Sequence, residues 1–323
     1  MNYSEIFNSL ASQKILIIGD VMLDSYVWGA VERISPEAPV PVVHVSHTEN
    51  RLGGAANVAK NIHALGLIPI LCSVIGDDDA GKNLCAVLHK RDISADCCFV
   101  SSQRVTTVKT RVMSGNHQML RIDNERIEPL SKQDNAQLCA HVFDIIEQQE
   151  IAAIVLQDYD KGVLTADTIS SIVSAARKKT IPVVVDPKKN NFTDYSNVQL
   201  FKPNFKEFCD GTQSVCEKTD LDTLHMLAKK FMLEHSIERI MITLSEHGVF
   251  IANKDEYIHI SSQVRYVSDV SGAGDTVISV AVACLIAGLP DGDLARISNI
   301  AAGLACEMPG VVSITKEQLL KLV

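Results

Sequence analysis

Short, continuous apolar runs alternate along the chain with longer stretches that have helical periodicity. The apolar runs predict strands at 14–19, 151–157, 181–186, 199–202 and 239–243. The stretches between them predict helices at about 133–149, 165–179, 221–234 and 273–287. Strands that are apolar on both faces and alternate with helices are typical of a parallel sheet covered on both sides. The expected fold is therefore α/β, a mostly parallel sheet sandwiched by helices, and such sheets bind ligands at the carboxyl ends of their strands.

Two segments interrupt this alternation. Residues 21–47 carry three prolines among valines, which excludes a helix and suits exposed edge strands. Residues 104–123 have β-forming side chains on both sides of Ser114-Gly115-Asn116, which is a hairpin signal. Both segments therefore predict strands outside the regular alternation of the main sheet.

Together these segments predict a small β-sheet at the edge of the main sheet. One domain, 1–323, would then carry a lid formed by about 21–50 and 103–124. The alternative is a surface excursion without a role, but connections of this length usually have one. Asp20 and Asp24 follow the first strand, so they are expected at the ligand-binding edge beside this lid.

Composition and charge exclude several classes of partner. Of the 323 residues, 46% are hydrophobic and 21% are charged, as in a globular protein with a sizeable core. The formal net charge is −9 and the chain has no Lys/Arg cluster, so we expect no nucleic-acid partner. The nine cysteines form no CxxC pair, which favours reduced thiols over a disulfide or zinc framework. Without a signal peptide or an apolar run long enough to cross a membrane, a cytoplasmic protein with no membrane partner is expected.

The strongest chemical signal is DVSGAGDT at 269–276, which runs into an apolar helix. Gly272, Ala273 and Gly274 allow close backbone approach at the helix start. Unpaired amides and the positive end of the helix dipole there predict an anion hole for a phosphate in transfer. Asp275, just inside the helix, is placed to take a proton from a hydroxyl that attacks this phosphate. The alternative is an aspartate that only stabilises the helix start.

A second glycine-rich helix start is RLGGAANVA at 51–59. Gly53 and Gly54 permit close backbone approach, and Asn57 projects an amide from the first turn. Together with Asp24 they predict a polar pocket for sugar hydroxyls, whereas Asp20 is a candidate for a structural role. A packing turn without a ligand is the alternative reading of the two glycines.

The third motif is KPNFKE at 202–207, directly after a predicted strand. Asn204 and Glu207, three residues apart, can present an amide and a carboxylate together. Such oxygen ligands hold Mg²⁺ beside nucleotide phosphates, usually through its waters. Lys202 is a further candidate partner for a phosphate. The alternative is a helix cap followed by an acid in the first turn.

Five motifs occur in one order along the chain: GDVMLD, GGAAN, VIGDDDAG, KPNFKE and DVSGAGDT. In this combination the chain resembles the ribokinase-like sugar kinases, also called the PfkB family, over essentially its whole length. GGAANVAKNIHALG, a K-x-R strand followed by RID, DYDKG and VDPK are similar to members that act on D-glycero-β-D-manno-heptose 7-phosphate. The resemblance implies a ribokinase-like fold and the use of ATP and Mg²⁺.

The resemblance also implies a reaction. The anomeric hydroxyl of the heptose 7-phosphate would be phosphorylated to the 1,7-bisphosphate, a precursor of nucleotide-activated heptose for lipopolysaccharide. Because an anomeric hydroxyl is more acidic than an ordinary alcohol, a carboxylate near its usual pKa is expected to suffice as the base. The alternative is the same chemistry on fructose phosphate or ribose. Lid edges in this family often pair between subunits, so a homodimer through the lid is expected.

The residue roles implied by the resemblance agree with those expected from the motifs. Asp275 would be the catalytic base, with the amides of Gly272, Ala273 and Gly274 as the anion hole. The residues implied to bind the sugar are Asp24, Gly53, Gly54 and Asn57. The residues implied to lie at the nucleotide are Lys202, Asn204, Glu207, Ser245, Gly248, Gly272, Gly274 and Asn299, with Asn204 and Glu207 serving Mg²⁺ indirectly.

The distal phosphate of the sugar needs cations. Lys109 and Arg111 alternate onto one face of a predicted lid strand, and Arg121 lies in its partner strand. Lys161 and Lys188 follow strand ends and are alternative candidates, which the sequence does not rank. A charged outer strand face without a ligand is the simpler reading of the lid cations.

Two departures from the family pattern affect the periphery of the site. Asp160 stands where the family more often has a small residue, and CEMPGVVS at 306–313 replaces a run that usually contains small polar residues. The adenine pocket is therefore less defined than the catalytic core.

A nicotinamide dehydrogenase would need GxGxxG after the first strand, where this chain has GDVMLD. A sugar-binding protein without activity is the remaining alternative, which the intact Asp275 disfavours.

Overall fold

A nine-stranded sheet organises the body of the protein, in the order β13-β12-β11-β10-β9-β8-β1-β4-β5. The computed structural model describes residues 2–115, 117–262, 266–308 and 310–323. In sheet order the strands are β13 (Tyr257–Ile260), β12 (Val249–Ala252), β11 (Ile240–Thr243), β10 (Leu200–Phe201), β9 (Val183–Asp186), β8 (Ile151–Gln157), β1 (Lys14–Gly19), β4 (Ile68–Gly76) and β5 (Cys98–Ser101). Neighbouring strands from β5 to β11 pair in parallel, whereas β12 and β13 pair antiparallel. The mostly parallel sheet predicted from the apolar runs is confirmed.

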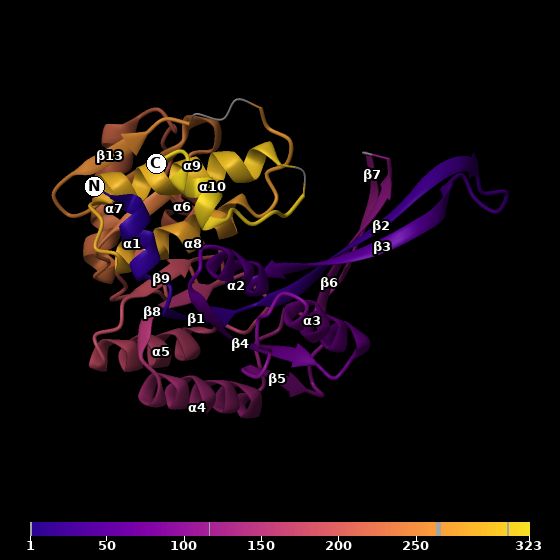
Figure 1. Ribbon diagram of the computed structural model, residues 1–323, viewed down its shortest axis with the longest axis horizontal. Coiled ribbons are helices and arrows are strands. Elements are labelled where there is room, and N and C mark those ends of the chain that lie inside the picture. Colours follow the sequence, from indigo (N-terminus) through magenta and orange to yellow (C-terminus); the bar gives the residue numbers. More distant parts are fainter. Residues whose placement is uncertain (1, 116, 263–265, 309) are drawn as a thin grey trace.

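Alternate side chains of each central strand enter two different hydrophobic cores. In β1, Ile15 and Ile17 belong to one core and Leu16 and Ile18 to the other. The first core contains residues of α1 (Tyr3–Ser9), α2 (Ala55–Ala64), α3 (Asp79–His89), α8 (Ala273–Ile286), α9 (Asp291–Glu307) and α10 (Lys316–Leu320). The second contains residues of α4 (Lys132–Gln148), α5 (Ala166–Lys178), α6 (Phe205–Thr212) and α7 (Leu221–His235). Helices therefore cover both faces of the sheet, as expected for strands that are apolar on both sides (Figure 1).

The predicted elements agree with the structure except at some ends. The helix expected at 273–287 is Ala273–Ile286, and its residues from Asp275 to Cys284 are all buried. The strand expected at 181–186 begins later, at Val183. The strand begins late because Pro182 has no N–H group to donate to the hydrogen bonds of the sheet.

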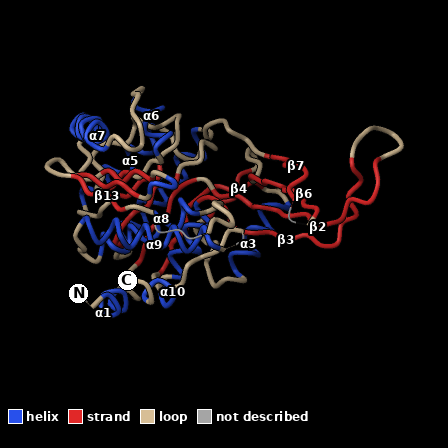
Figure 2. The backbone as a smooth tube through the Cα atoms, turned by 90° about the horizontal axis from the view of Figure 1, so that it is seen from above, coloured by secondary structure: helices blue, strands red, loops and turns tan. Residues whose placement is uncertain are grey.

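A second, four-stranded sheet has the order β3-β2-β6-β7. Its strands are β2 (Val21–Ile34), β3 (Pro41–Gly54), β6 (Thr107–Ser114) and β7 (His117–Asn124). The predicted hairpin at 104–123 is present as the antiparallel pair β6 and β7, and Asn116 of its turn lies outside the described residues. This sheet projects far from the body as a long ribbon (Figures 1 and 2).

The ribbon is joined directly to the edge of the main sheet at which the parallel strands end. Only Asp20 separates β1 from β2, so the chain passes from the core strand straight into the ribbon. The return strand β3 ends at Gly54, which is the residue before α2. Both ends of the β2–β3 hairpin are therefore anchored where the parallel strands finish.

Candidate active site

The carboxyl ends of the central parallel strands bring polar residues together. Gln157 at the end of β8 pairs in register with Gly19 of β1 on one side and with Asp186 of β9 on the other. Lys202 follows β10 directly, and its ammonium lies 3.0 Å from the Asp186 carboxylate. These residues share one edge of the sheet because parallel strands all end on the same side.

Asp275 lies in the first turn of α8 and reaches this edge. Its Oδ2 accepts a hydrogen bond of 2.6 Å from Nδ2 of Asn57, which projects from α2. Its Oδ1 accepts hydrogen bonds from the Tyr159 hydroxyl at 2.7 Å and from Nε2 of Gln157 at 3.2 Å. The structure thus brings together Asp275 and Asn57, as predicted, and adds two residues that sequence reasoning missed. The signal for both was the segment QDYDKG directly after the apolar run of β8.

The environment of Asp275 shifts its proton affinity. Burial raises its pKa to about 6, although the hydrogen bonds from Asn57 and Tyr159 act in the opposite direction. The pKa of Asp275 therefore lies above the usual carboxylate value that was expected to suffice for the base, because burial disfavours the charged form. A carboxylate with this pKa is still ionised at neutral pH and is a stronger base than an exposed aspartate.

Two buried oxygens beside Asp275 lack a partner. Within the described ranges, Asn57 Oδ1 and Gln157 Oε1 are buried and accept no hydrogen bond. Unpaired buried acceptors are costly and usually indicate a missing ligand or water. Both residues already donate to Asp275 through their amide nitrogens, so their free oxygens are suited to hydroxyl donors of a ligand.

The start of α8 is built around a glycine that no other residue can replace without strain. Gly272 precedes the helix with φ +80, and no side chain caps the helix there. A Cβ at this position would lie 2.9 Å from Cγ1 of Val311 and 3.1 Å from Nδ2 of Asn57. Lys202 lies near the next glycine, since a Cβ on Gly274 would be 3.8 Å from its ammonium. The start of a helix next to a buried cation is suited to a phosphoryl group. The Ala273 amide is not unpaired as expected, because it donates to the Val270 carbonyl at 3.3 Å.

Asp24 lies at the base of the ribbon, beside the glycine turn that leads into α2. It accepts a hydrogen bond of 2.5 Å from Nη1 of Arg111. A Cβ on Gly53 would approach Oδ2 of Asp24 to 2.6 Å, and Gly54 has φ +60. The two glycines therefore let the turn approach Asp24 closely, and the structure brings Asp24, Gly53 and Arg111 together.

Asp20 has a structural role, which was one of the two roles considered for it. Its carboxylate accepts hydrogen bonds from the backbone amides of Tyr159, Lys161 and Val163 at 2.8, 3.1 and 3.1 Å. Burial and the charge of Asp158 raise the pKa of Asp20 to about 6, against the effect of these amides. Asp20 thereby holds the loop after β8 and positions Tyr159 toward Asp275.

The cations considered for the distal sugar phosphate all have carboxylate partners. Lys109 pairs with Asp123 at 3.2 Å and with Glu125 at 3.0 Å. Lys161 also pairs with Glu125, at 2.8 Å, and the half-exposed Arg121 pairs with Asp123 at 2.9 Å. Lys109 and Lys161 therefore converge on one acid, whereas Arg121 lies further out on the ribbon.

Asn204 and Glu207 form the helix cap that was the alternative to a metal-related role. Oδ1 of Asn204 accepts from the Glu207 amide at 2.8 Å, and Oε2 of Glu207 accepts from the Asn204 amide at 2.9 Å. The second oxygen of Glu207 pairs with Lys188. Across the described residues, no group of three or more acidic, His or Cys side chains is arranged to hold a metal ion. The donors present therefore fit Mg²⁺ only as indirect partners, through its waters.

Ser245, Gly248 and Asn299 lie around the end of β13. Ser245 begins the short helix η1 (Ser245–His247) with φ 58, and Gly248 follows it with φ +91. A Cβ on Gly248 would lie 2.0 Å from the carbonyl oxygen of Ile260, and Nδ2 of Asn299 donates to the Ser261 carbonyl at 2.9 Å. The structure thus brings these three predicted nucleotide residues to one region.

Comparison with known proteins identifies the class of this protein. The model of the pfkB family of carbohydrate kinases matches residues 12–318, and the chain belongs to this family. It is 40% identical over 321 residues to "Bifunctional protein HldE" of Pelobacter propionicus, covering 98% of this chain and 64% of the relative. It is 39% identical over 309 residues to the protein of the same name from Methylobacillus flagellatus, covering 94% of this chain and 62% of the relative. The chain thus spans less than two thirds of the length of these relatives.

Solved structures show the same fold at low sequence identity. Phosphofructokinase-2 from Escherichia coli in complex with fructose-6-phosphate superimposes with a TM-score of 0.77 at 19% identity, covering 96% of this chain and 97% of that one. Arabidopsis thaliana ribokinase complexed with ribose and ATP gives a TM-score of 0.75 at 17% identity, covering 96% and 98%. The predicted ribokinase-like fold is confirmed. In the part of the chain that is described, no helix has the length and apolarity to span a bilayer.

Proposed function

We propose that this chain is an ATP-dependent kinase for the anomeric hydroxyl of D-glycero-β-D-manno-heptose 7-phosphate. Its product is the 1,7-bisphosphate, a precursor of nucleotide-activated heptose for lipopolysaccharide, made in the cytoplasm. Membership of the carbohydrate kinase family supports the reaction class. The choice of sugar is supported by the motifs that resemble those of heptose 7-phosphate kinases and by the similarity to relatives named HldE.

The observation that carries the proposal is the position of Asp275. Its carboxylate lies at the start of α8, is buried, and is oriented by donors from Asn57 and Tyr159. In the proposed reaction the anomeric hydroxyl gives its proton to this carboxylate as its oxygen attacks the γ-phosphorus of ATP. The bond from that phosphorus to the β–γ bridging oxygen breaks, and ADP leaves with the electron pair. The amides of Gly272 and Gly274, together with Lys202, stabilise the charge on the moving phosphoryl group, whereas the Ala273 amide is held by the Val270 carbonyl.

The sugar is proposed to bind between the body and the ribbon. The free oxygens of Asn57 and Gln157 accept hydrogen bonds from sugar hydroxyls, which removes the cost of two unpaired buried acceptors. Asp24 accepts from a further hydroxyl, beside Gly53 and Gly54. The distal phosphate is bound by Lys109, Arg111 and Arg121 of the ribbon, with Lys161 and Lys188 as the alternative cations.

The nucleotide is proposed to bind over the start of α8 and beside α6. Asn204 and Glu207 orient the waters of Mg²⁺, which neutralises charge on the ATP phosphates when bound. Ser245, Gly248 and Asn299 border the adenosine part, which their position around the end of β13 supports. Asp275 is not a metal partner in this arrangement and remains free to accept the proton.

The ribbon is proposed to act as the lid of a single domain, 1–323, and as the contact of a homodimer. Its lid segments are about 21–50 and 103–124. The strands that form it expose large apolar side chains to solvent, namely Ile34, Val45, Met119, Leu120 and Ile122. Exposed apolar side chains on projecting strands favour association with a second surface. A second copy of the ribbon is the partner proposed here.

A substrate panel tests the proposed function. The full chain is given ATP, Mg²⁺ and, in turn, heptose 7-phosphate, fructose 1-phosphate, fructose 6-phosphate and ribose, and ADP release is measured. The expected result is a kcat/KM for heptose 7-phosphate at least about a hundredfold above that of the other sugars, because unpaired buried polar groups reject analogues strongly. Equal or higher efficiency with a fructose phosphate or ribose would overturn the choice of sugar and leave the kinase class intact.

A further inference from the structure

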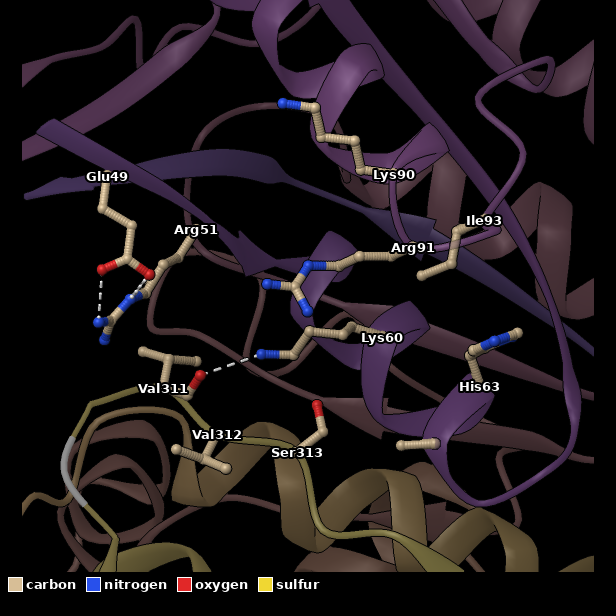
Figure 3. Close-up of a pocket in the computed structure, with 11 residues that line it drawn as sticks. Glu49, Arg51, Lys60, His63, Lys90, Arg91, Ile93, Val311, Val312 and Ser313 are labelled. Atoms are coloured by element: carbon tan, nitrogen blue, oxygen red, sulfur yellow. Dashed lines mark hydrogen bonds and ion pairs between the residues drawn. The ribbon is translucent and has the colours of Figure 1, made fainter.

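A cavity of about 610 Å³ lies between the base of the ribbon, α2, the end of α3 and the segment after α9 (Figure 3). Its lining residues are Glu49, Arg51, Lys60, His63, Ala64, Lys90, Arg91, Ile93, Val311, Val312 and Ser313. The residues proposed above to bind sugar or nucleotide do not line this cavity. It is therefore a separate space, although it shares α2 with the proposed active site.

Positive charge in this cavity exceeds negative charge. Of the lining residues that the structure describes, Glu49 is the only acid, and Arg51 already donates to both of its oxygens at 2.8 and 2.7 Å. Among the residues that the structure describes, no carboxylate pairs with Lys60, Lys90 or Arg91. Lys109, Arg111 and Arg121 of the ribbon differ in this respect, because each of them has an acidic partner. The cavity therefore carries positive charge that the protein itself does not neutralise.

Lys60 is the most unusual of these cations. Its side chain is 8% exposed, and its ammonium donates to the backbone carbonyl of Val311 at 3.1 Å. Burial and the nearby charge of Arg91 lower its pKa to about 8. In Figure 3 the Lys60 ammonium and the Arg91 guanidinium are directed toward the same space. A buried lysine next to a like charge is unfavourable unless an anion binds to both.

The cavity is in direct contact with the proposed anion hole. Val311, whose carbonyl binds Lys60, packs against the start of α8 so closely that a Cβ on Gly272 would lie 2.9 Å from its Cγ1. On the other side, a Cβ on Gly310 would lie 2.0 Å from Nη1 of Arg51. An anion bound to Lys60 and Arg51 would therefore hold the segment that supports Gly272.

We propose that this cavity is a second phosphoryl-binding site, which takes a phosphorylated small molecule distinct from the sugar and the ATP of the reaction. Lys60 and Arg91 bind the phosphoryl oxygens through charged hydrogen bonds, and Arg51 supports them from the ribbon side. The Ser313 hydroxyl is directed into the same space and supplies a neutral donor (Figure 3). Occupancy of the site steadies Val311 beside the anion hole.

The test is calorimetric titration of the full chain with pyrophosphate and with inorganic phosphate, without sugar or ATP. The expected result is saturable binding that is weakened at least about tenfold by Lys60→Met and by Arg91→Gln, which each remove one charge-assisted partner. Lys82→Met is the matched control, because Lys82 lies on α3, is 73% exposed and pairs with Asp79. Circular dichroism melting shows whether each variant is folded.

Two further arms separate this site from the proposed active site. In the Lys202→Met variant, which alters the anion hole and leaves the cavity intact, the component sensitive to Lys60 must persist. Saturating heptose 7-phosphate must leave that component unchanged. Absence of saturable binding, or binding that is equal in both cavity variants and the control, would overturn the proposal. Competition by heptose 7-phosphate would overturn it as well, by assigning the cavity to the substrate's own phosphate. None of these arms needs turnover, so failure of the proposed kinase function would be seen separately.

Discussion

Nδ2 of Asn57 donates a hydrogen bond of 2.6 Å to the carboxylate of Asp275, across 218 positions of the chain. The contact joins the first turn of α2 to the first turn of α8, and both turns follow glycines with positive φ. Asn57, which is proposed to bind the sugar, therefore also orients Asp275, the proposed base. In the proposed reaction, substrate binding and proton transfer would therefore be coupled through one side chain.

Removal of the Tyr159 hydroxyl is expected to shift the pH dependence of the reaction. This hydroxyl donates to Oδ1 of Asp275 and lowers the pKa of the carboxyl group, so Tyr159→Phe raises that pKa further above 6. The acidic limb of kcat/KM then moves to higher pH by up to about one unit, with little loss of activity at pH 9.

A pH profile from pH 5 to pH 9 measures this shift. Tyr195→Phe is the matched control, because the Tyr195 hydroxyl donates to a different carboxylate, that of Asp158, at 2.8 Å. An acidic limb that stays in place in the Tyr159 variant while moving in the control would contradict the assignment.

The buried charge of Asp275 is expected to make the fold less stable at neutral pH. Its pKa is about 6 in the folded state and 3.8 ordinarily, so the folded state binds the proton more tightly. The resulting stabilisation is complete below pH 3.8 and is lost as the pH rises through 6. The loss amounts to about 3 kcal/mol, at about 1.4 kcal/mol per pKa unit.

Asp275→Asn removes this titration. Its free energy of unfolding, relative to the native protein, is expected to rise between pH 4 and pH 7. Denaturant unfolding at several pH values measures the difference, and other titrating groups such as Asp20 cancel because both proteins contain them. A difference that stays constant with pH would show that Asp275 has an ordinary pKa.

A methyl group at Gly272 is expected to damage the anion hole. Gly272→Ala places a Cβ 2.9 Å from Val311 and 3.1 Å from Asn57, so one of these side chains or the start of α8 has to shift. A misplacement of this kind costs roughly a hundredfold in kcat/KM. Gly288→Ala is the matched control, because Gly288 has φ +68 and no atom within 4 Å of its added Cβ.

Both glycine variants carry the backbone cost of about 1–2 kcal/mol that alanine has at positive φ. Thermal melting is therefore expected to show similar losses of stability from this cause in both variants. Steady-state kinetics is expected to show a loss of kcat/KM in Gly272→Ala alone. Equal activity of the two variants would remove Gly272 from the proposed anion hole.

The exposed apolar side chains of the ribbon are expected to hold two copies together. Leu120 and Ile122 of β7 are 55% and 52% exposed and lie on one face of the strand. Changing both to Glu is predicted to convert a dimer into a monomer of 35.2 kDa in sedimentation. Val215→Glu is the control, because Val215 is 95% exposed on the body. A native protein that sediments as a monomer would contradict the proposed contact.

The main sheet was predictable because its strands are continuous apolar runs, and alternate side chains such as Ile15 and Leu16 do enter two cores. The helix start that carries Asp275 was predictable because Gly272 and Asp275 are neighbours in the sequence. The edge that gathers Asp275 and Asn57 follows from the rule for parallel strands. Local sequence and general topology thus account for the core of the candidate site.

Other parts of the site depend on packing that no local pattern encodes. Gln157 and Tyr159 are ordinary polar residues after a strand, and only the fold directs them to Asp275. The raised pKa of Asp275 arises from burial by distant segments, which spacing does not reveal. The cavity cations Lys60 and Arg91 come from α2 and the end of α3, so their proximity appears only in three dimensions.

The most direct measurement compares wild type and Asp275→Asn with ATP, Mg²⁺ and heptose 7-phosphate, following the 1,7-bisphosphate by phosphorus NMR. The account predicts product from the wild type and a rate lower by about 10²–10⁴-fold in the variant, the usual contribution of a general base. ATP affinity, measured by titration, should be nearly unchanged. A variant that forms the bisphosphate at a near-normal rate would contradict the role of Asp275.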